Sequence, residues 1–379
     1  MRAYLDNSAT TRPCPEAVAA MTEALTEGFY NPSAVYRPAV EAFRRLREAR
    51  ENVLSRVNGR GCELTFTSGG TEGNNLAILG AVTRMRGRQI VAVSAVEHPS
   101  VRAAFDALAE IGHEVRVIGV DRAGVPDWTA LERALDDGAS FVSMMQVNNE
   151  TGALLDAKRL HDTVAGRALV HVDGVQGFMR VPFDMKYADL YTLSGHKIHG
   201  PKGIGALVAR KGVHLNPRQV GGGQENGLRS GTENTPGIAG LSAAVTAMAD
   251  LGPDMPRKLM LKKLRFIEAV RRGVPDVIVN GPAPEDAAPH IVNLGFPNVR
   301  GEVMLHALEG DGICVSTGSA CSSKKLKVSG VLTSMGIAPN VAEWAVRFSL
   351  SPHTTEEELD YAADRVAAQY DLLKRYVRR

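Results

Sequence analysis

The sequence predicts an α/β protein with a large domain, built on a mostly parallel seven-stranded sheet flanked by helices, and a smaller α+β domain. Strand-like apolar runs and helical segments alternate regularly from Leu64 to Val208, which is typical of a parallel sheet covered by helices on both faces. The alternation then stops, and residues 252–256 (GPDMP) have the composition of a domain boundary. We therefore expect the large domain over residues 15–252 and the small domain over residues 1–14 and 253–379.

Two helices are expected on the N-terminal side of the sheet. Residues 4–13 have too few apolar positions for a helix or a core strand, and their small polar side chains suit a segment that lies across a surface or a cleft. Apolar residues recur at helical spacing after Pro15, and Gly28 ends that helix. A longer amphipathic helix is expected from about Pro38 to Val57.

Short apolar runs supply the strands of the predicted sheet, and helical patterns separate most of them. After Arg210 a polar loop over residues 221–234 precedes an alanine-rich helix at about 238–251. The runs are residues 64–67, 90–95, 115–120, 141–145, 168–172, 190–193 and 204–208, and the helices between them cover about 100–111, 128–135 and 157–165.

The C-terminal third predicts the smaller α+β domain. The final helix is expected to begin at Thr355, because Glu358 follows three residues later with the spacing of a capping box. The other expected elements are helices at about 258–270 and 302–308 and strands at 277–280, 291–295 and 345–350.

The composition restricts the class of protein. Hydrophobic residues make up 44% of the chain and charged residues 23%, as in ordinary globular proteins, and a net charge of +2 gives no reason to expect a nucleic-acid partner. No apolar run is long enough to span a bilayer and the N-terminus does not resemble a signal peptide, so we expect a cytoplasmic protein without a membrane partner. The four cysteines show no Cys-x-x-Cys spacing, and one of them in a polar loop is a candidate reactive thiol. We predict no metal site.

Polar side chains follow the predicted strands. We expect them to converge on one rim, because ligands of α/β sheets bind beyond the carboxyl ends of the strands. Residues 68–75 (SGGTEGNN) connect a strand to a helix start, where free N–H groups favour a phosphate, although a plain tight turn has the same composition. They match neither a GxGxxG nor a Walker loop. The rim residues are Thr71, Glu97, His98, Asn148, Asn149, Glu150, Asp173, Gln176, Ser194, His196 and Lys197.

Lys197 lies on a tight turn after the apolar run 190–193. Desolvation lowers the pKa of a lysine and frees its amine to form a Schiff base with an aldehyde; a phosphate-binding or ordinary loop lysine is the alternative. Asp173 follows a buried strand, where it either caps a helix or pairs with a cation such as a protonated pyridine nitrogen. His98 either stacks on a planar ring or is structural. Together with the phosphate-type turn, these residues indicate pyridoxal 5′-phosphate as the cofactor.

Seven motifs, in the same order along nearly the whole chain, resemble those of the class V aminotransferase-fold cysteine desulfurases of the NifS/IscS type. The resemblance implies a pyridoxal-phosphate-dependent fold and activity on L-cysteine. Selenocysteine lyase or another class V lyase or aminotransferase is the alternative. The motifs are residues 4–11 (YLDNSATT), 67–75 (TSGGTEGNN), 147–152 (VNNETG), 171–176 (HVDGVQ), 194–205 (SGHKIHGPKGIG), 229–232 (RSGT) and 316–323 (STGSACSS).

The resemblance implies a role for the residues around the cofactor ring. Lys197 would hold the cofactor covalently and move protons, and Asp173 would pair with the pyridine nitrogen. Gln176 would bond the phenolic oxygen, and His98 would stack on the ring.

The resemblance also implies ligands for the phosphate and for the substrate. Gly70, Thr71, Ser194 and His196 would hold the phosphate, and Thr232 would reach the phosphate of the neighbouring subunit's cofactor, which makes a homodimer part of the site. The substrate carboxylate would be bound by Asn149 and Arg347, with Asn7 and Arg37 adding to that pocket.

Cys321 lies in a loop of small polar residues, and the lysines at 324, 325 and 327 would favour its thiolate. The resemblance implies that this thiolate attacks the sulfur of L-cysteine, which leaves a persulfide on Cys321 and releases alanine. A sulfur-acceptor protein, either an iron–sulfur scaffold or a sulfur carrier, would then take the sulfur for iron–sulfur clusters, thio-cofactors or tRNA thiolation. A non-catalytic sulfur-carrier protein, a different class, would need Cys321 but not Lys197.

Overall fold

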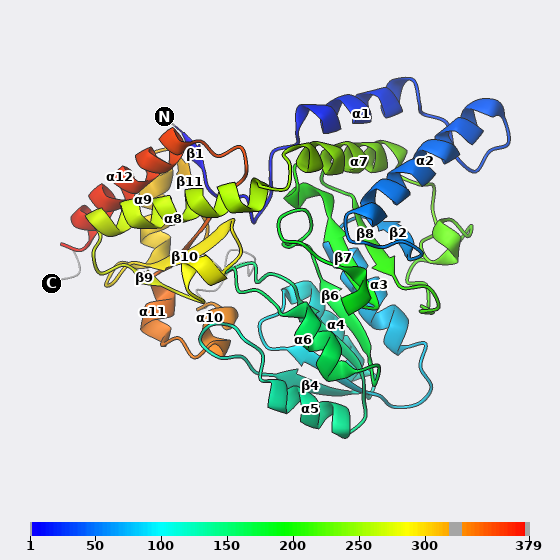
Figure 1. Cartoon of the computed structure of the whole chain (residues 1–379), viewed down its shortest axis with the longest axis horizontal. Coiled ribbons are helices and arrows are strands. Elements are labelled where there is room, and N and C mark those ends of the chain that lie inside the picture. Colours follow the sequence, from blue (N-terminus) through cyan, green and yellow to red (C-terminus); the bar gives the residue numbers. More distant parts are fainter. Residues whose placement is uncertain (1, 318–327, 376–379) are drawn as a thin grey trace.

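The computed structural model describes residues 2–317 and 328–375. A seven-stranded sheet forms its largest layer (Figure 1). Of the described strands in this sheet, only β8 runs in the direction opposite to the other six, so the predicted mostly parallel sheet is confirmed. In spatial order the strands are β2 (Glu63–Thr67), β8 (Gly205–Ala209), β7 (Leu190–Ser194), β6 (Leu169–Asp173), β5 (Ala139–Met145), β3 (Ile90–Ser94) and β4 (Glu114–Ile118).

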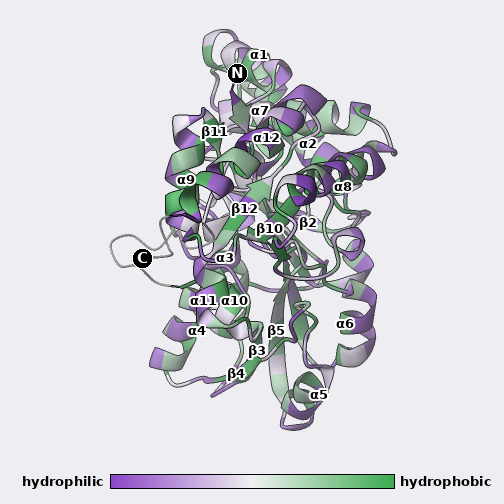
Figure 2. Ribbon diagram, turned by 90° about the vertical axis from the view of Figure 1, so that its left-hand side faces the viewer, coloured by the Kyte–Doolittle hydropathy of each residue, from purple (hydrophilic) through white to green (hydrophobic). Residues whose placement is uncertain are grey.

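Helices cover both faces of this sheet. Val91 and Val93 of β3 belong to a core cluster with residues of α3 (Gly70–Val82) and α4 (Pro99–Glu110). Ala92 points to the opposite face and belongs to the main cluster, which includes residues of α5 (Trp128–Asp136) and α6 (Ala157–Val164). Figure 2 shows β3 and β5 with α4 on one side and α6 on the other. Strands buried on both faces are continuous apolar runs, which is why the sequence alone reveals them.

Helices α1 (Pro15–Thr26) and α2 (Arg37–Ser55) both pack against α7 (Thr235–Asp250) (Figure 1). The helix predicted after Pro15 is confirmed. Ala17 and Ala24 are buried, whereas Val18 and Leu25 are exposed. Val18 and Leu25 therefore point away from the rest of the chain, whereas Met21 is partly buried against Gly240 of α7.

The C-terminal third and the first residues form a second, smaller part of the molecule, with both termini on its side in Figure 1. Residues 4–13 are predicted to hold no helix or core strand, and the two-residue strand found here, in which Ala3 and Tyr4 pair with Ile313 and Cys314, overlaps them only at Tyr4. No described helix is both long and apolar enough to cross a membrane. The strands are β9 (Ile278–Val279), β10 (Ile291–Gly295) and β12 (Ala345–Ser349) in an antiparallel sheet, and β1 (Ala3–Tyr4) beside β11 (Ile313–Cys314). The helices are α8 (Met255–Gly273), α9 (Gly301–Gly310), α10 (Gly330–Ser334), α11 (Pro339–Glu343) and α12 (Glu356–Leu373).

Thr355 begins α12 with both bonds of the predicted capping box. Its Oγ1 accepts from the Glu358 N–H at 3.2 Å, and the Glu358 carboxylate accepts from the Thr355 N–H at 2.8 Å. We expect Thr355→Ala to lower the free energy of unfolding by about 1 kcal/mol, because the Glu358 N–H loses its partner. Urea denaturation followed by circular dichroism measures the change. The control is Thr22→Ala on the exposed side of α1, with a shift below about 0.5 kcal/mol; equal shifts in the two variants would contradict the prediction.

Candidate active site

The carboxyl ends of the parallel strands meet at one edge of the large sheet, and several predicted residues lie there. Asp173 is the last residue of β6, and Ser194 is the last residue of the adjacent strand β7. Lys197 ends a 3₁₀ turn directly after β7. His98 caps the N-terminus of α4 after β3, and Asn149 lies in the connection after β5. The structure thus brings these five residues to one edge.

Asp173 has a buried carboxylate held by two donors. The Asn74 side-chain amide of α3 donates to Oδ2 at 2.8 Å, and the Val175 N–H donates to Oδ1 at 2.9 Å. The same Asn74 amide donates to the Ser100 Oγ at 3.0 Å, and that oxygen lies 2.8 Å from the His98 Nδ1. A chain of hydrogen bonds therefore links Asp173 with His98. A buried carboxylate calls for a cationic partner, and a protonated pyridine nitrogen fits this requirement.

The two histidines of this edge are neutral at pH 7. Burial lowers the pKa of His98 below its usual 6.5; the charge of Asp173 opposes this shift and that of Lys197 adds to it. Burial, followed by the charge of Lys197, lowers the pKa of His196 to about 4. A neutral imidazole has one donor and one acceptor nitrogen. His98 can therefore lie against an aromatic ring, and His196 can donate one hydrogen bond to an anion.

The start of α3 and the end of β7 fit a phosphate. The Ser194 Oγ is buried and has no hydrogen-bond partner among the described residues. A Cβ built on Gly69 would lie 3.8 Å from this oxygen, so the hydroxyl lies beside the free N–H groups of the helix start. A Cβ on Gly70 would come within 2.5 Å of the Val175 Cγ2, so glycine is needed for α3 to begin this close to the turn after β6. Thr71 follows in the first turn and is exposed.

The N-terminal segment lies against Lys197. The Lys197 Nζ donates to the carbonyl oxygens of Ser8 at 2.6 Å and Ala9 at 2.8 Å. The Gln176 side chain donates to the same Ser8 oxygen at 2.9 Å, and its Oε1 accepts from the Arg180 Nη1 at 3.1 Å. Arg180 is buried and also donates to the Lys197 carbonyl. These bonds fix the direction of the Lys197 side chain at the edge of the sheet.

Arg347 of β12 connects the small sheet to the same edge. Its Nη1 donates to the Asn149 carbonyl at 2.8 Å and its Nη2 to the Asp6 carboxylate at 2.8 Å. The Arg347 Nε and the Asn149 Oδ1 are buried without partners among the described residues. The Asn7 amide instead donates to the Ser349 carbonyl at 2.9 Å. The unpartnered guanidinium N–H can donate to the carboxylate of an amino acid, and the Asn149 side chain can donate to it through its Nδ2, because its Oδ1 is an acceptor.

Two acidic side chains near these groups are also buried. The Glu97 Oε1 accepts from the Met145 N–H at 2.6 Å, and its Oε2 has no partner among the described residues. Burial raises the pKa of Glu97 well above 4.5, and the charge of Asp173 raises it further. Burial also raises the pKa of Glu150 to about 7, against the opposing effects of its bond to Ser329 and of the charge of Arg347.

Several contributors to this edge were not predicted from the sequence. Asn74, Ser100 and Arg180 position the predicted residues, and Asp6 pairs with Arg347. Asn74 and Asp6 lie inside two of the seven motifs, and this is the only feature of the sequence that points to them. No feature of the sequence points to Ser100 or Arg180, because their hydrogen-bond partners are set by the tertiary fold.

Three predicted residues are not placed at this edge within one chain. Thr232 is exposed in the loop before α7, and Arg37 is the exposed first residue of α2. Cys321 lies outside the described residues, together with the lysines that follow it.

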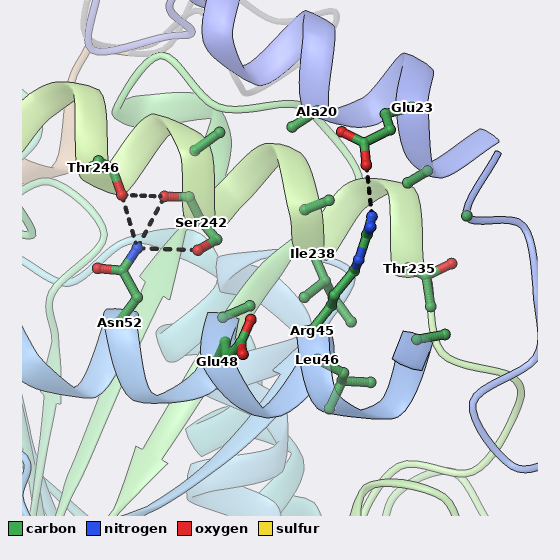
Figure 3. A pocket seen from close by; sticks show the side chains of 16 residues that line it. Ala20, Glu23, Arg45, Leu46, Glu48, Asn52, Thr235, Ile238, Ser242 and Thr246 are labelled. Carbon is green, nitrogen blue, oxygen red and sulfur yellow. Dashed lines mark hydrogen bonds and ion pairs between the residues drawn. The ribbon is translucent and has the colours of Figure 1, made fainter. Parts of the chain in front are cut away.

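A separate cavity of about 440 Å³ lies between α1, α2 and α7 (Figure 3). Small side chains line most of it. The Arg45–Glu23 ion pair of 2.7 Å lies at one side, and the Asn52 amide, bonded to Ser242 and Thr246, lies at another. None of its lining residues was predicted to contact cofactor or substrate, and we assign it no part in the chemistry.

Comparison with known proteins agrees with this geometry. Residues 3–362 match the family model described as aminotransferase class-V. A cysteine desulfurase of Trichormus azollae is 38% identical over 361 residues, which cover 94% of this chain and 90% of that protein.

Solved structures show the same fold. A NifS-like protein superposes with a TM-score of 0.90 at 32% identity, covering 98% of this chain and 100% of the other. The structure described as SspA in complex with cysteine has a TM-score of 0.81 at 28% identity, covering 93% of this chain and 100% of the other.

The burial of Glu97 predicts a pH effect on stability. Above pH 4.5 the unfolded chain releases the Glu97 proton while the folded chain keeps it, so folding loses stability as the pH rises toward the raised pKa. Measured from pH 5 upward, the free energy of unfolding of the wild type, relative to Glu97→Gln, should therefore fall as the pH rises, by at most about 1.4 kcal/mol per pH unit. Urea denaturation of both proteins across this range measures it. Parallel pH profiles would show that Glu97 titrates normally.

Proposed function

The chain belongs to the class V aminotransferase family and is a cysteine desulfurase that depends on pyridoxal 5′-phosphate; we propose that it transfers the sulfur of L-cysteine to Cys321 and releases L-alanine. The observation that supports the proposal is that three features lie together at one edge of the sheet. These are the buried Asp173 carboxylate, the Lys197 amine, and the start of α3 beside the unpartnered Ser194 hydroxyl. They match the three ends of the cofactor: its pyridine nitrogen, its aldehyde and its phosphate.

The proposed cofactor ligands follow from this match. Asp173 would hold the pyridine nitrogen in its protonated form, and the neutral ring of His98 would lie against the pyridine ring. The phosphate would be held by Ser194, His196 and the start of α3 at Gly70 and Thr71. Gln176, one of whose amide hydrogens is directed to Ser8, would hold the phenolic oxygen. When bound, the cofactor supplies an electron sink for the carbon next to the amino group of the substrate.

The chain's own groups bind the substrate and move its protons. Arg347 and Asn149 would take the carboxylate of L-cysteine through the unpartnered guanidinium Nε and the asparagine side chain. Asn7 lies beside them, with its amide bonded to Ser349. Lys197, once its amine is released, would take the proton from the Cα of the substrate and return a proton to the product.

The sulfur transfer step assigns the nucleophile to Cys321. Its thiolate would attack the sulfur atom of the substrate, so that a new S–S bond forms while the C–S bond breaks. The electron pair of the broken bond stays with the substrate carbon, and a proton converts that carbon into the methyl group of alanine. The outer sulfur of the Cys321 persulfide would then pass to a thiol of an acceptor protein.

We also infer where the sulfur goes. A persulfide on Cys321 is suited to delivery to an iron–sulfur scaffold or a sulfur-carrier protein. The three described cysteines, Cys14, Cys62 and Cys314, are free thiols, which supports a reducing compartment such as the cytoplasm.

A homodimer is the proposed assembly. Large apolar side chains on α1, α2 and the connection between them are exposed, as at protein–protein contacts. Thr232 and Arg37 are also exposed, so a partner subunit could receive them in its site. The exposed apolar side chains are Val18, Leu25, Phe29, Val35, Tyr36, Val40 and Phe43.

The first test measures alanine and sulfide release from L-cysteine with a thiol reductant, together with the visible absorbance of the cofactor. We expect Cys321→Ala to keep the bound cofactor and to lose at least about a hundredfold in turnover, because the nucleophile is gone. Lys197→Ala should lose the absorbance of the covalently held cofactor. Cys314→Ala is the matched control, since Cys314 is an exposed free thiol, and it should retain wild-type turnover. Normal turnover of Cys321→Ala would point to other amino-acid chemistry on this fold.

The second test measures the mass in solution by sedimentation equilibrium. Val35→Asp combined with Val40→Asp should convert the dimer into a monomer, because charges buried at an interface without partners are unfavourable. Val117→Asp changes a valine on the edge strand β4 that is about as exposed as Val40, and it should leave the dimer intact. A wild-type monomer, or a dimer that withstands the double substitution, would show that this surface is not the interface.

A further inference from the structure

Arg180 is a buried cation whose charge the proposed chemistry does not use. Its Nη1 donates to the Gln176 Oε1 at 3.1 Å, and its Nη2 donates to the carbonyl oxygens of Asn7, at 3.3 Å, and Lys197. All three acceptors are uncharged. Burial lowers the pKa of Arg180 to about 9, so the guanidinium still carries its charge at pH 7. A buried charge without an opposite charge is costly, and this position therefore calls for an anion nearby.

The described side chains around Arg180 do not supply that anion. The charge of Arg180 acts on His196, His199 and His290, whose pKa values are lowered mainly by burial and further by this charge. The pKa values of His196 and His199 are about 4 and that of His290 is well below 6.5, so all three rings are neutral at pH 7. The side chain of Lys197 is a second cation beside the first. No carboxylate of the described residues bonds to Arg180, so an anionic group of a bound ligand would be stabilised there.

Arg180 also decides which way the Gln176 amide faces. A guanidinium can only donate, so the bond requires Gln176 to present its oxygen to Arg180. The amide nitrogen is then directed to the Ser8 carbonyl, to which it donates at 2.9 Å. The Lys197 Nζ donates to the same Ser8 oxygen at 2.6 Å, so the Gln176 nitrogen and the Lys197 amine lie beside one oxygen atom. An amide nitrogen has two hydrogens, and the second is available to a ligand at this place.

We propose that Arg180 is a positioning residue for the phenolic oxygen of the cofactor: it holds Gln176 as a donor toward that oxygen and supplies the positive charge that favours its ionised form. The inference rests on the proposed function. The aldehyde and the phenolic oxygen of pyridoxal phosphate are on adjacent ring carbons, so a donor beside the Lys197 amine is suited to this oxygen. The bond to Gln176 favours the phenolic oxygen over the phosphate as the anion that Arg180 stabilises.

The first test measures, by fluorescence titration of the cofactor-free full chain, the dissociation constants of pyridoxal phosphate and of an analogue that lacks the phenolic oxygen. Arg180→Gln and Arg180→Met should weaken the binding of pyridoxal phosphate about tenfold, because Gln176 and the charge no longer favour the phenolic oxygen. Both should leave the affinity for the analogue within about twofold of wild type. Gln176→Ala should show the same selective loss.

The second test follows the visible absorbance of the loaded enzyme against pH. Its midpoint reports the loss of the proton that the Lys197 nitrogen and the phenolic oxygen share. A positive charge favours the ionised oxygen and lowers this midpoint, so the neutral variants Arg180→Gln and Arg180→Met should raise it by about one pH unit. Arg180→Lys keeps the charge and a donor, and its midpoint should stay within about half a pH unit of wild type.

A structural role of Arg180 would give different results. Equal losses of affinity for both ligands in the neutral variants would overturn the inference, as would unfolding of both, monitored by circular dichroism. An unshifted midpoint in the neutral variants, a shift in Arg180→Lys as large as theirs, or an unchanged preference for pyridoxal phosphate in Gln176→Ala would also overturn it. A wild-type protein that binds no pyridoxal phosphate would instead refute the proposed function.

Discussion

The buried carboxylate of Asp173 is the constraint on which the rest of the site depends. It requires donors inside the protein, and one of them is the Asn74 amide of α3. That helix reaches Asp173 because Gly70 lets it begin close to the turn after β6. The same Asn74 amide holds Ser100, which in turn fixes the ring of His98. One side chain of α3 therefore sets the positions of the proposed pyridine partner and of the stacking histidine together.

The segment around Ser8 joins the two parts of the molecule at this point. Asp6 pairs with Arg347 of the small sheet, and the Ser8 carbonyl accepts from Lys197 at the edge of the large sheet. The Thr11 N–H donates to the carbonyl of His196 at 2.8 Å. The groups proposed to bind the substrate and those proposed to bind the cofactor are therefore connected through a few residues of backbone, so movement of this segment would affect both.

The strands and the rim were predictable from the sequence because each leaves a local signal: strands buried on both faces are apolar throughout, and polar residues follow them. The bonds that position the rim leave no such signal, since Asn74 and Asp173 are 99 residues apart. The sequence also leaves open which face of α1 is buried. Periodicity shows which residues share a face but not which face a neighbour covers, and α7 packs on the side of Ala17 and Ala24. The assignment of Cys321 as the nucleophile rests on its sequence motif alone.

Contacts between the first residues and the last strand set the order in which the parts of the protein can fold during synthesis on the ribosome. The Asn7 amide bonds to Ser349, 342 residues later, and β1 pairs with β11. The large sheet, by contrast, needs nothing beyond Ala209 to complete its strands. During synthesis the sheet that carries Asp173 can therefore assemble early, and Ser8 and Thr11 can already bond to Lys197 and His196. Residues 3–7, by contrast, must wait for β11 and β12 until nearly the whole chain has emerged. A nascent chain would thus form the proposed cofactor edge before the arginine pocket for the substrate exists.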